Sequence, residues 1–130
     1  MKKSNKKKLE DLWIKVIKAR AGYKSELSGK PGKQIGGETI LTGHHIVGKP
    51  NDRLRFELDN GICLDNGAEH LFGVHNKFDP VKAKMYQDKI ISYIGNDRYE
   101  KLLSMRNGTY KVDLKAVEIM LKQELQKYDG

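Results

Sequence analysis

Apolar residues recur with helical spacing near the start of the chain. Five of them follow the i, i+3, i+4, i+7, i+8 pattern that places side chains on one side of a helix: Leu9, Leu12, Trp13, Val16 and Ile17. Gly22 follows as a residue that ends helices. Residues 25–37 hold four glycines and a proline, which predicts turns and a loop.

The pattern changes to that of strands in the middle of the chain. Aliphatic and β-branched residues from Glu38 to Val47 predict one strand, and turn-forming residues at 48–52 end it. A second short strand is predicted from Gly61 to Leu64, and a helical segment from His70 to Lys77. We expect these strands to form a small hairpin.

The C-terminal half reads as helices. Asp79 is suited to cap a helix that begins at Pro80 and ends at Gly95. A short helix is predicted over residues 97–106, and Asp113 is suited to cap a last helix over residues 113–128. The fold class is therefore α+β, with a hairpin between an N-terminal helix and C-terminal helices.

Length and charge narrow the picture further. The 130 residues correspond to one domain at 9–130, preceded by a basic arm at 1–8. The chain has 25 lysines and arginines against 17 acidic residues, a net charge of +8, which favours a nucleic-acid partner over mere solubility. No apolar run reaches the roughly 18 residues of a membrane span, and no signal-peptide core is present, so we expect a cytoplasmic protein with no membrane partner.

All four histidines lie in one short stretch: His44, His45, His70 and His75. Asn60 lies between the pair and the later two. Imidazole serves both as a general base near neutral pH and as a ligand of divalent metals. Their confinement to this stretch predicts a hydrolytic metal site.

This arrangement resembles the HNH (ββα-metal) endonuclease motif, in the form found in small HNH proteins of phage genomes. The motif core is Leu41 to Lys77: Thr42-Gly-His44-His45-Ile46, then Leu58-Asp-Asn60-Gly-Ile-Cys-Leu64, then His70 and His75. The helical part at 79–130 contains the Arg98 to Leu102 stretch that also matches the flanks of such proteins. The resemblance covers most of the chain and implies a ββα-metal hairpin.

The resemblance also implies roles. His45 would be the general base, and Asn60 would bind the metal or orient the base or its loop. His44 and His70 would be metal ligands, with His75 as a further ligand. The implied activity is hydrolysis of DNA phosphodiester bonds with one divalent cation (Mg²⁺, Mn²⁺, Ni²⁺ or Zn²⁺), in the host cytoplasm if the protein is phage-encoded.

One departure from the family concerns structural zinc. Many phage-type relatives carry two Cys-x-x-Cys knuckles, where this chain has Ser25 and Ser28, then Asp65 and Ala68. Serine and alanine cannot replace thiolate ligands, and Cys63 is the only cysteine. We therefore expect no structural zinc, packing that holds the hairpin instead, and an inert buried thiol at Cys63.

Geometry raises three objections to the roles. Neighbouring strand residues point to opposite faces, so His44 and His45 share a site only at a strand end or at a bulge beside Gly43. His70 and His75 are five apart, which a regular helix splays by about 140°, so a break near Gly73 is required. Asn60-Gly61 is also a common hairpin-turn dipeptide.

The basic residues nearest the motif are Lys49, Arg53 and Arg55, which we expect either to contact phosphates or to form a solvated loop. Two other functions stay open. One is a non-catalytic DNA-binding module with an HNH fold, and the other is a recombination-accessory protein that binds DNA junctions. The pattern leaves the oligomeric state open.

Overall fold

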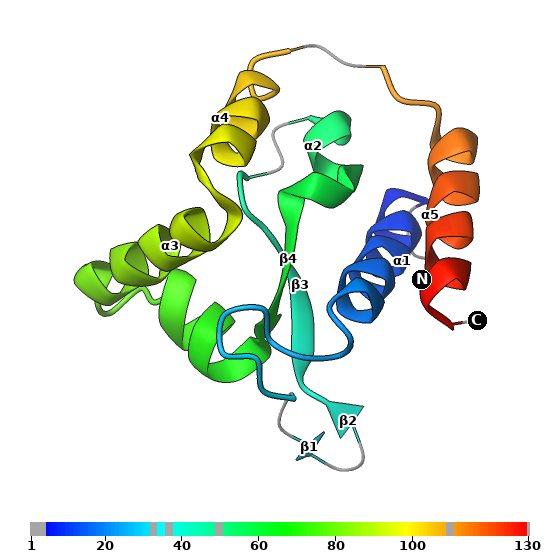
Figure 1. Cartoon of the computed structure of the whole chain (residues 1–130). Coiled ribbons are helices and arrows are strands. Elements are labelled where there is room, and N and C mark those ends of the chain that lie inside the picture. Colours follow the sequence, from blue (N-terminus) through cyan, green and yellow to red (C-terminus); the bar gives the residue numbers. More distant parts are fainter. Residues whose placement is uncertain (1–4, 32–33, 36–37, 49–50, 109–110, 130) are drawn as a thin grey trace.

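The computed structural model describes residues 5–31, 34–35, 38–48, 51–108 and 111–129, and its fold is α+β (Figure 1). The elements are, in order, α1 (Asn5–Arg20), β1 (Gln34–Ile35), β2 (Glu38–Thr39), β3 (Leu41–His45), α2 (Asp52–Phe56), the 3₁₀ turn η1 (Leu58–Asn60), β4 (Gly61–Asp65), the π-helix η2 (Asn66–Val74), α3 (Pro80–Ile94), α4 (Asn96–Ser104) and α5 (Leu114–Asp129). Among these residues, no helix is both long and apolar enough to cross a membrane.

The central element is the antiparallel hairpin of β3 and β4. Five consecutive residue pairs join the strands, from Leu41 with Asp65 to His45 with Gly61, with no inserted residue. Side chains therefore alternate between two faces along the full length of both strands. β1 and β2 form a second, separate antiparallel pair.

A hydrophobic cluster packs on each face of the hairpin, which makes three layers (Figure 1). On one face lie α1 and α5, and the cluster there includes Trp13, Ile17, Leu41, Cys63 and Leu121. On the other lie α3 and α4, with Ile62, Leu64, Ile90, Leu102 and Met105. The apolar stripe predicted for α1 is the side that this helix buries.

Two glycines let α1 lie directly on the strands. A Cβ atom at Gly61 would come within 2.7 Å of Trp13 Cζ2, and one at Gly43 within 3.1 Å of Trp13 Cζ3. A strand glycine often marks such a close approach of another element. Gly61 therefore serves the packing of α1 and is not the turn residue of a tight hairpin.

The ends of the C-terminal helices follow the predicted signals. Asp79 accepts a hydrogen bond from Lys82 N at the start of α3, and Gly95 ends that helix with φ of 89°. Asp113 accepts from Lys115 N beside the start of α5. These boundaries confirm the prediction from capping residues.

Other boundaries differ from the predicted ones. The first helix begins at Asn5, so residues 5–8 of the expected arm are helical, and residues 1–4 lie outside the described part. The expected strand at 38–47 is divided into β2 and β3. The short helix α2 lies where a loop was expected, and Asn51 caps it by accepting from Leu54 N.

Candidate metal centre

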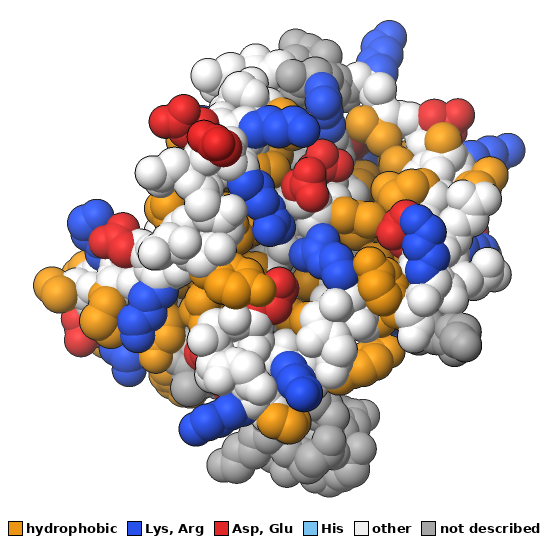
Figure 2. All heavy atoms as spheres, in the orientation of Figure 1, with side chains coloured by type: hydrophobic (Ala, Val, Ile, Leu, Met, Phe, Trp, Pro, Cys, Tyr) orange, Lys and Arg blue, Asp and Glu red, His pale blue; other side chains and the backbone are white. Residues whose placement is uncertain are grey.

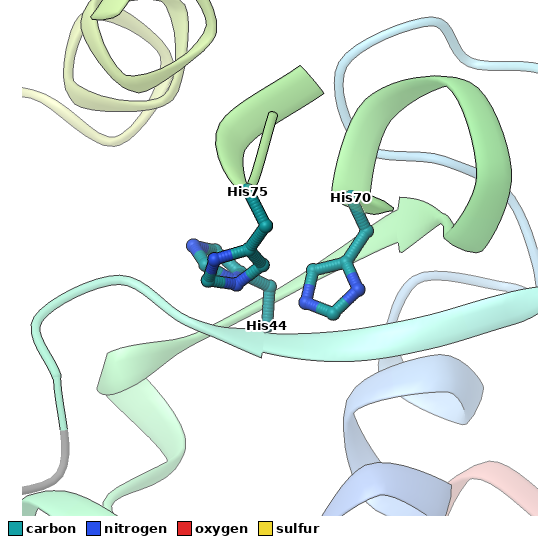
Figure 3. Close-up of side chains that lie close together, drawn as sticks. All are labelled: His44, His70 and His75. Carbon is teal, nitrogen blue, oxygen red and sulfur yellow. The ribbon is translucent and has the colours of Figure 1, made fainter. Parts of the chain in front are cut away.

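Three histidines from three places in the fold converge on one point (Figure 3). His44 extends from β3, His70 from η2, and His75 from the residue after the η2 helix ends. One ring nitrogen of each lies within 4.8 Å of the other two. Side chains that are 31 residues apart in the chain thus form one cluster, the His44–His70–His75 cluster.

The π-helix explains how residues five apart in sequence meet. His75 N donates to His70 O at 3.0 Å, the hydrogen bond between residues i and i+5 that defines a π-helix. This pattern stacks His75 one turn beyond His70, and their ring centroids lie 4.6 Å apart. The expected break near Gly73 is wrong, because η2 runs through that residue to Val74.

The donor set of the cluster fits a cation. His44 is 7% exposed, and its Nε2 is buried with no hydrogen-bond partner among the described residues. Leaving such an atom unpaired is costly, and coordination would satisfy it. His70 Nδ1 lies 3.0 Å from the Asn66 amide oxygen, which only accepts, so Nδ1 carries the proton and Nε2 remains as the ligand atom.

The three histidine side chains of the cluster are increasingly exposed to solvent from His44 to His75. His44 is buried, His70 is half-buried and His75 is exposed. A metal held here would be enclosed on the β3 side and open toward solvent beside His75. An open side is typical of catalytic sites, whereas structural zinc sites are closed by protein ligands.

Burial and neighbouring charges keep the rings of His44 and His70 neutral. Burial, followed by the neighbouring charges of His70, His75 and His45, lowers the pKa of His44 to about 3. Burial and then His75 lower the pKa of His70 to about 4. Neutral imidazole is the form that binds metal, so both rings are ready to bind at pH 7.

The structure does not bring His45 into the cluster. Because β3 is regular, His45 faces α1, where its ring stacks on Trp13 with centroids 4.1 Å apart and planes 4° from parallel. Its Nε2 lies 2.9 Å from the carbonyl oxygen of Arg55. A carbonyl only accepts, so Nε2 carries the proton and Nδ1 is the basic nitrogen of the neutral ring.

Asn60 is fully buried and organises the segment between the strands. Its side chain accepts from Val47 N at 2.9 Å and donates to Val47 O at 2.9 Å and Leu54 O at 3.0 Å. Both ends of the amide are therefore engaged by the backbone of the β3–β4 connection. Of the two roles expected for this residue, its contacts match the orientation of the loop.

The basic residues predicted to contact phosphates are placed differently from one another. Arg55 donates to Glu10 from Nε at 2.9 Å and lies 2.8 Å from it through Nη2, which ties α2 to α1. Arg53 is exposed, and Lys49 lies outside the described residues. Of the predicted set, Arg53 is the described side chain whose exposure suits a phosphate contact.

Two arginines that pattern reasoning missed hold the start of β4. Arg20 of α1 donates to Leu58 O and Gly61 O at 2.9 and 2.8 Å. Arg98 of α4 donates to Asp59 O at 2.9 and 2.7 Å and to Gly61 O at 3.2 Å. Their targets are backbone carbonyls, which leave no mark on the side-chain pattern. Arg98 enters the sequence resemblance only as the start of the 98–102 stretch, and the contacts of both arginines with β4 could not be predicted from it.

A hydrogen-bond network includes Ser25 and Ser28, the two positions compared above with a zinc knuckle. Ser25 Oγ donates to Glu69 at 2.6 Å and accepts from Leu27 N and Ser28 N. Glu69 also accepts from Asp65 N at 2.8 Å. Cys63 is buried, and burial raises the pKa of its thiol to about 12, so the thiol stays protonated.

The chain is thus an α+β protein in which β3, η2 and the residue after η2 bring three imidazoles together around a point suited to a divalent cation. Comparison with protein-family models, with curated proteins and with solved structures finds no match to this chain. The geometry and chemistry of the cluster therefore carry the functional conclusion.

Proposed function

We propose that this protein is a metal-dependent endonuclease of the HNH type that hydrolyses phosphodiester bonds in DNA. The observation that carries the proposal is the His44–His70–His75 cluster, which has one side open to solvent and one buried nitrogen without a partner in the described part of the chain. The order of strand, strand and helix around it agrees with the ββα arrangement that the sequence resemblance implies. The net charge of +8 suits a polyanionic substrate.

His44, His70 and His75 would hold one divalent ion. Three imidazoles favour Mn²⁺, Ni²⁺ or Zn²⁺ over Mg²⁺, which prefers oxygen ligands. When bound, such an ion supplies Lewis-acid stabilisation of charge on the phosphate and on the departing oxygen. The π-helical hydrogen bond from His75 N to His70 O sets the backbone spacing of these two residues, and the contact with Asn66 orients the His70 ring.

His45 is the proposed general base. Its hydrogen bond to the Arg55 carbonyl holds one tautomer, and the stack on Trp13 holds the plane of the ring. In this role the His45 ring takes the proton from water. Because His45 is the last residue of β3 and His44 precedes it on the opposite face, we place the scissile phosphate at this end of the strand.

The position of His45 also supports a second function, that of a non-catalytic DNA-binding module. His45 packs on Trp13 and points away from the cluster, an arrangement that would equally serve a buried structural residue. In that case the protein would be a metal-binding module that binds DNA without cutting it.

A plasmid-nicking assay separates the two functions. We expect wild-type protein to nick supercoiled DNA with Mn²⁺, Ni²⁺, Zn²⁺ or Mg²⁺ and not with EDTA. The variant His45→Phe keeps a ring against Trp13 but cannot accept a proton, so it should retain the fold and lose nicking. His44→Gln should lose nicking through loss of the metal.

Each result has a definite meaning, provided that circular dichroism shows the variants to be folded. Nicking that persists in His45→Phe rules out His45 as the base. A folded wild-type protein that binds DNA and cuts it with none of the four ions overturns the nuclease in favour of the binding module.

A further inference from the structure

Two phenylalanines that lie within three residues of His75 in the chain are exposed to solvent. Phe72 on η2 is 64% exposed, and Phe78, three residues after His75, is 99% exposed. Large apolar side chains left this exposed within a few residues of each other are typical of an interaction surface.

The turn that carries Phe78 is built by one side chain. Asn76 donates from Nδ2 to Phe72 O at 2.9 Å and accepts at Oδ1 from Phe78 N and Asp79 N, both at 2.9 Å. The backbones of the two phenylalanines are thereby tied to the same amide. Phe78 precedes the N-cap of α3, where an apolar side chain often packs back on the helix, yet its exposure shows that it does not.

The segment that includes Phe78 and most of α3 is rich in lysine. Between Lys77 and Lys89 the chain has four lysines and two aspartates. Hydrophobic and basic side chains alternate over the outer end of α3, at the left of Figure 2, where Val81 and Met85 line a shallow groove with Lys84. Of the two aspartates, Asp79 caps α3 and Asp88 pairs with Lys84 at 3.6 Å.

We propose that Phe72 and Phe78 stack on unpaired bases of a DNA strand whose phosphates contact the neighbouring lysines. A nucleobase offers a flat π face to an aromatic ring while its phosphate offers negative charge, and proteins that bind single strands combine these two contacts. Charge favours an anionic partner over a second copy of this chain. A second copy has the same net charge of +8 and therefore does not offer the negative charge that the lysines would bind.

The inference rests on the proposed nuclease and names its substrate class. His75 lies between Phe72 and Phe78 in the chain, so a base held by either ring would place the adjoining phosphate near the open side of the cluster. The preferred substrate is then DNA with unpaired or distorted bases, such as a gap, a bubble or a branch, over intact duplex.

The first test measures binding without cleavage. Fluorescence anisotropy in EDTA compares a single-stranded oligonucleotide with a duplex of the same length. We expect Phe78→Ala to weaken single-strand binding about tenfold, in line with stacking of one base, and to leave duplex binding unchanged. The matched control is Val81→Ala, which removes an apolar side chain that is 80% exposed but has no π face. The base analogue 2-aminopurine should lose fluorescence with wild type and regain it with Phe78→Ala.

Three results would overturn the inference: equal losses for Phe78→Ala and Val81→Ala, no loss for either, or a dimer by light scattering that Phe78→Ala dissociates. A cleavage assay then separates this inference from the nuclease proposal. Metal-dependent cutting that is equal for duplex and bubble DNA, and unchanged in Phe78→Ala, removes the inference and leaves the nuclease. Single-strand binding that depends on Phe78, without cutting by any ion, removes the nuclease and leaves the stacking surface.

Discussion

The Ser25 hydroxyl donates to the Glu69 carboxylate at 2.6 Å, and both residues are buried. Glu69 directly precedes His70 in η2, so this bond ties the loop after α1 to the element that carries one of the candidate metal ligands. The hydrogen bond holds this loop against η2 at the position where a zinc-binding pair of cysteines would otherwise hold it.

Removal of this bond should destabilise the protein. Ser25→Ala leaves Glu69 with one fewer donor in a buried place, and we expect the free energy of unfolding to fall by about 1–3 kcal/mol. Urea denaturation measures the change. Ser28→Ala is the matched control, because the Ser28 hydroxyl accepts an exposed hydrogen bond from Lys30 N and its loss should cost less than about 0.5 kcal/mol. Equal effects of the two changes would contradict the role given to Ser25.

Metal should stabilise the fold through the cluster. A ligand present at a hundred times its Kd adds about 2.7 kcal/mol to the stability of the native state. Thermal melts with Ni²⁺ or Zn²⁺ against EDTA should therefore show a higher Tm for wild type and no shift for His44→Gln. His45→Phe should keep the shift, because His45 lies outside the cluster. A shift that survives in His44→Gln would remove His44 from the ligand set.

Stability without metal should depend on pH. The pKa of His44 is about 3 and that of His70 about 4 in the folded protein, both below the ordinary value of 6.5. The unfolded chain therefore binds more protons below pH 6.5, which favours unfolding. The contribution is fully present above pH 6.5 and falls as the pH drops toward 4. Urea denaturation in EDTA between pH 7.5 and 5 should show this loss, and His44→Gln should show a smaller one. If the free energy of unfolding changes equally with pH in wild type and in His44→Gln, His44 is not a source of the pH dependence.

The approach of α1 to the hairpin gives a fourth prediction. Gly61→Ala places a methyl group against Trp13 and Ile17, and we expect about 1–3 kcal/mol of destabilisation from overpacking. Gly48→Ala meets no atom within 4 Å and should change stability by less than about 0.5 kcal/mol. Equal stabilities for the two variants, measured by urea denaturation, would show that α1 can shift away from the strands at little cost.

Local patterns were sufficient to predict several elements. Helical spacing of Trp13, Val16 and Ile17 predicted α1, and the capping residues Asp79 and Asp113 predicted the starts of α3 and α5. Of the four histidines that the sequence confines to one stretch, His44, His70 and His75 lie together in the structure and His45 does not. In each case the signal lies within a few residues of the feature.

Features that depend on distant contacts could not be predicted in this way. The burial of Asn60 depends on carbonyls of Val47 and Leu54, and the restraint of Gly61 on Arg20 and Arg98 from two separate helices. A plain asparagine-glycine pair and two ordinary basic residues carry no local trace of these bonds. The same holds for the face that His45 takes, which follows from the regular pairing of β3 with β4.

The π-helical turn between His70 and His75 has a consequence for insertions and deletions. Loss of one residue, for example Gly73, would bring the two histidines to a separation of four, which an ordinary α-helix places on one side. The pair can therefore stay together through a change in chain length that would rotate most helical ligands apart. Insertion of one residue would separate the two histidines, because no regular helix brings residues six apart together. We therefore expect the cluster to tolerate deletion of one residue between His70 and His75 but not insertion of one.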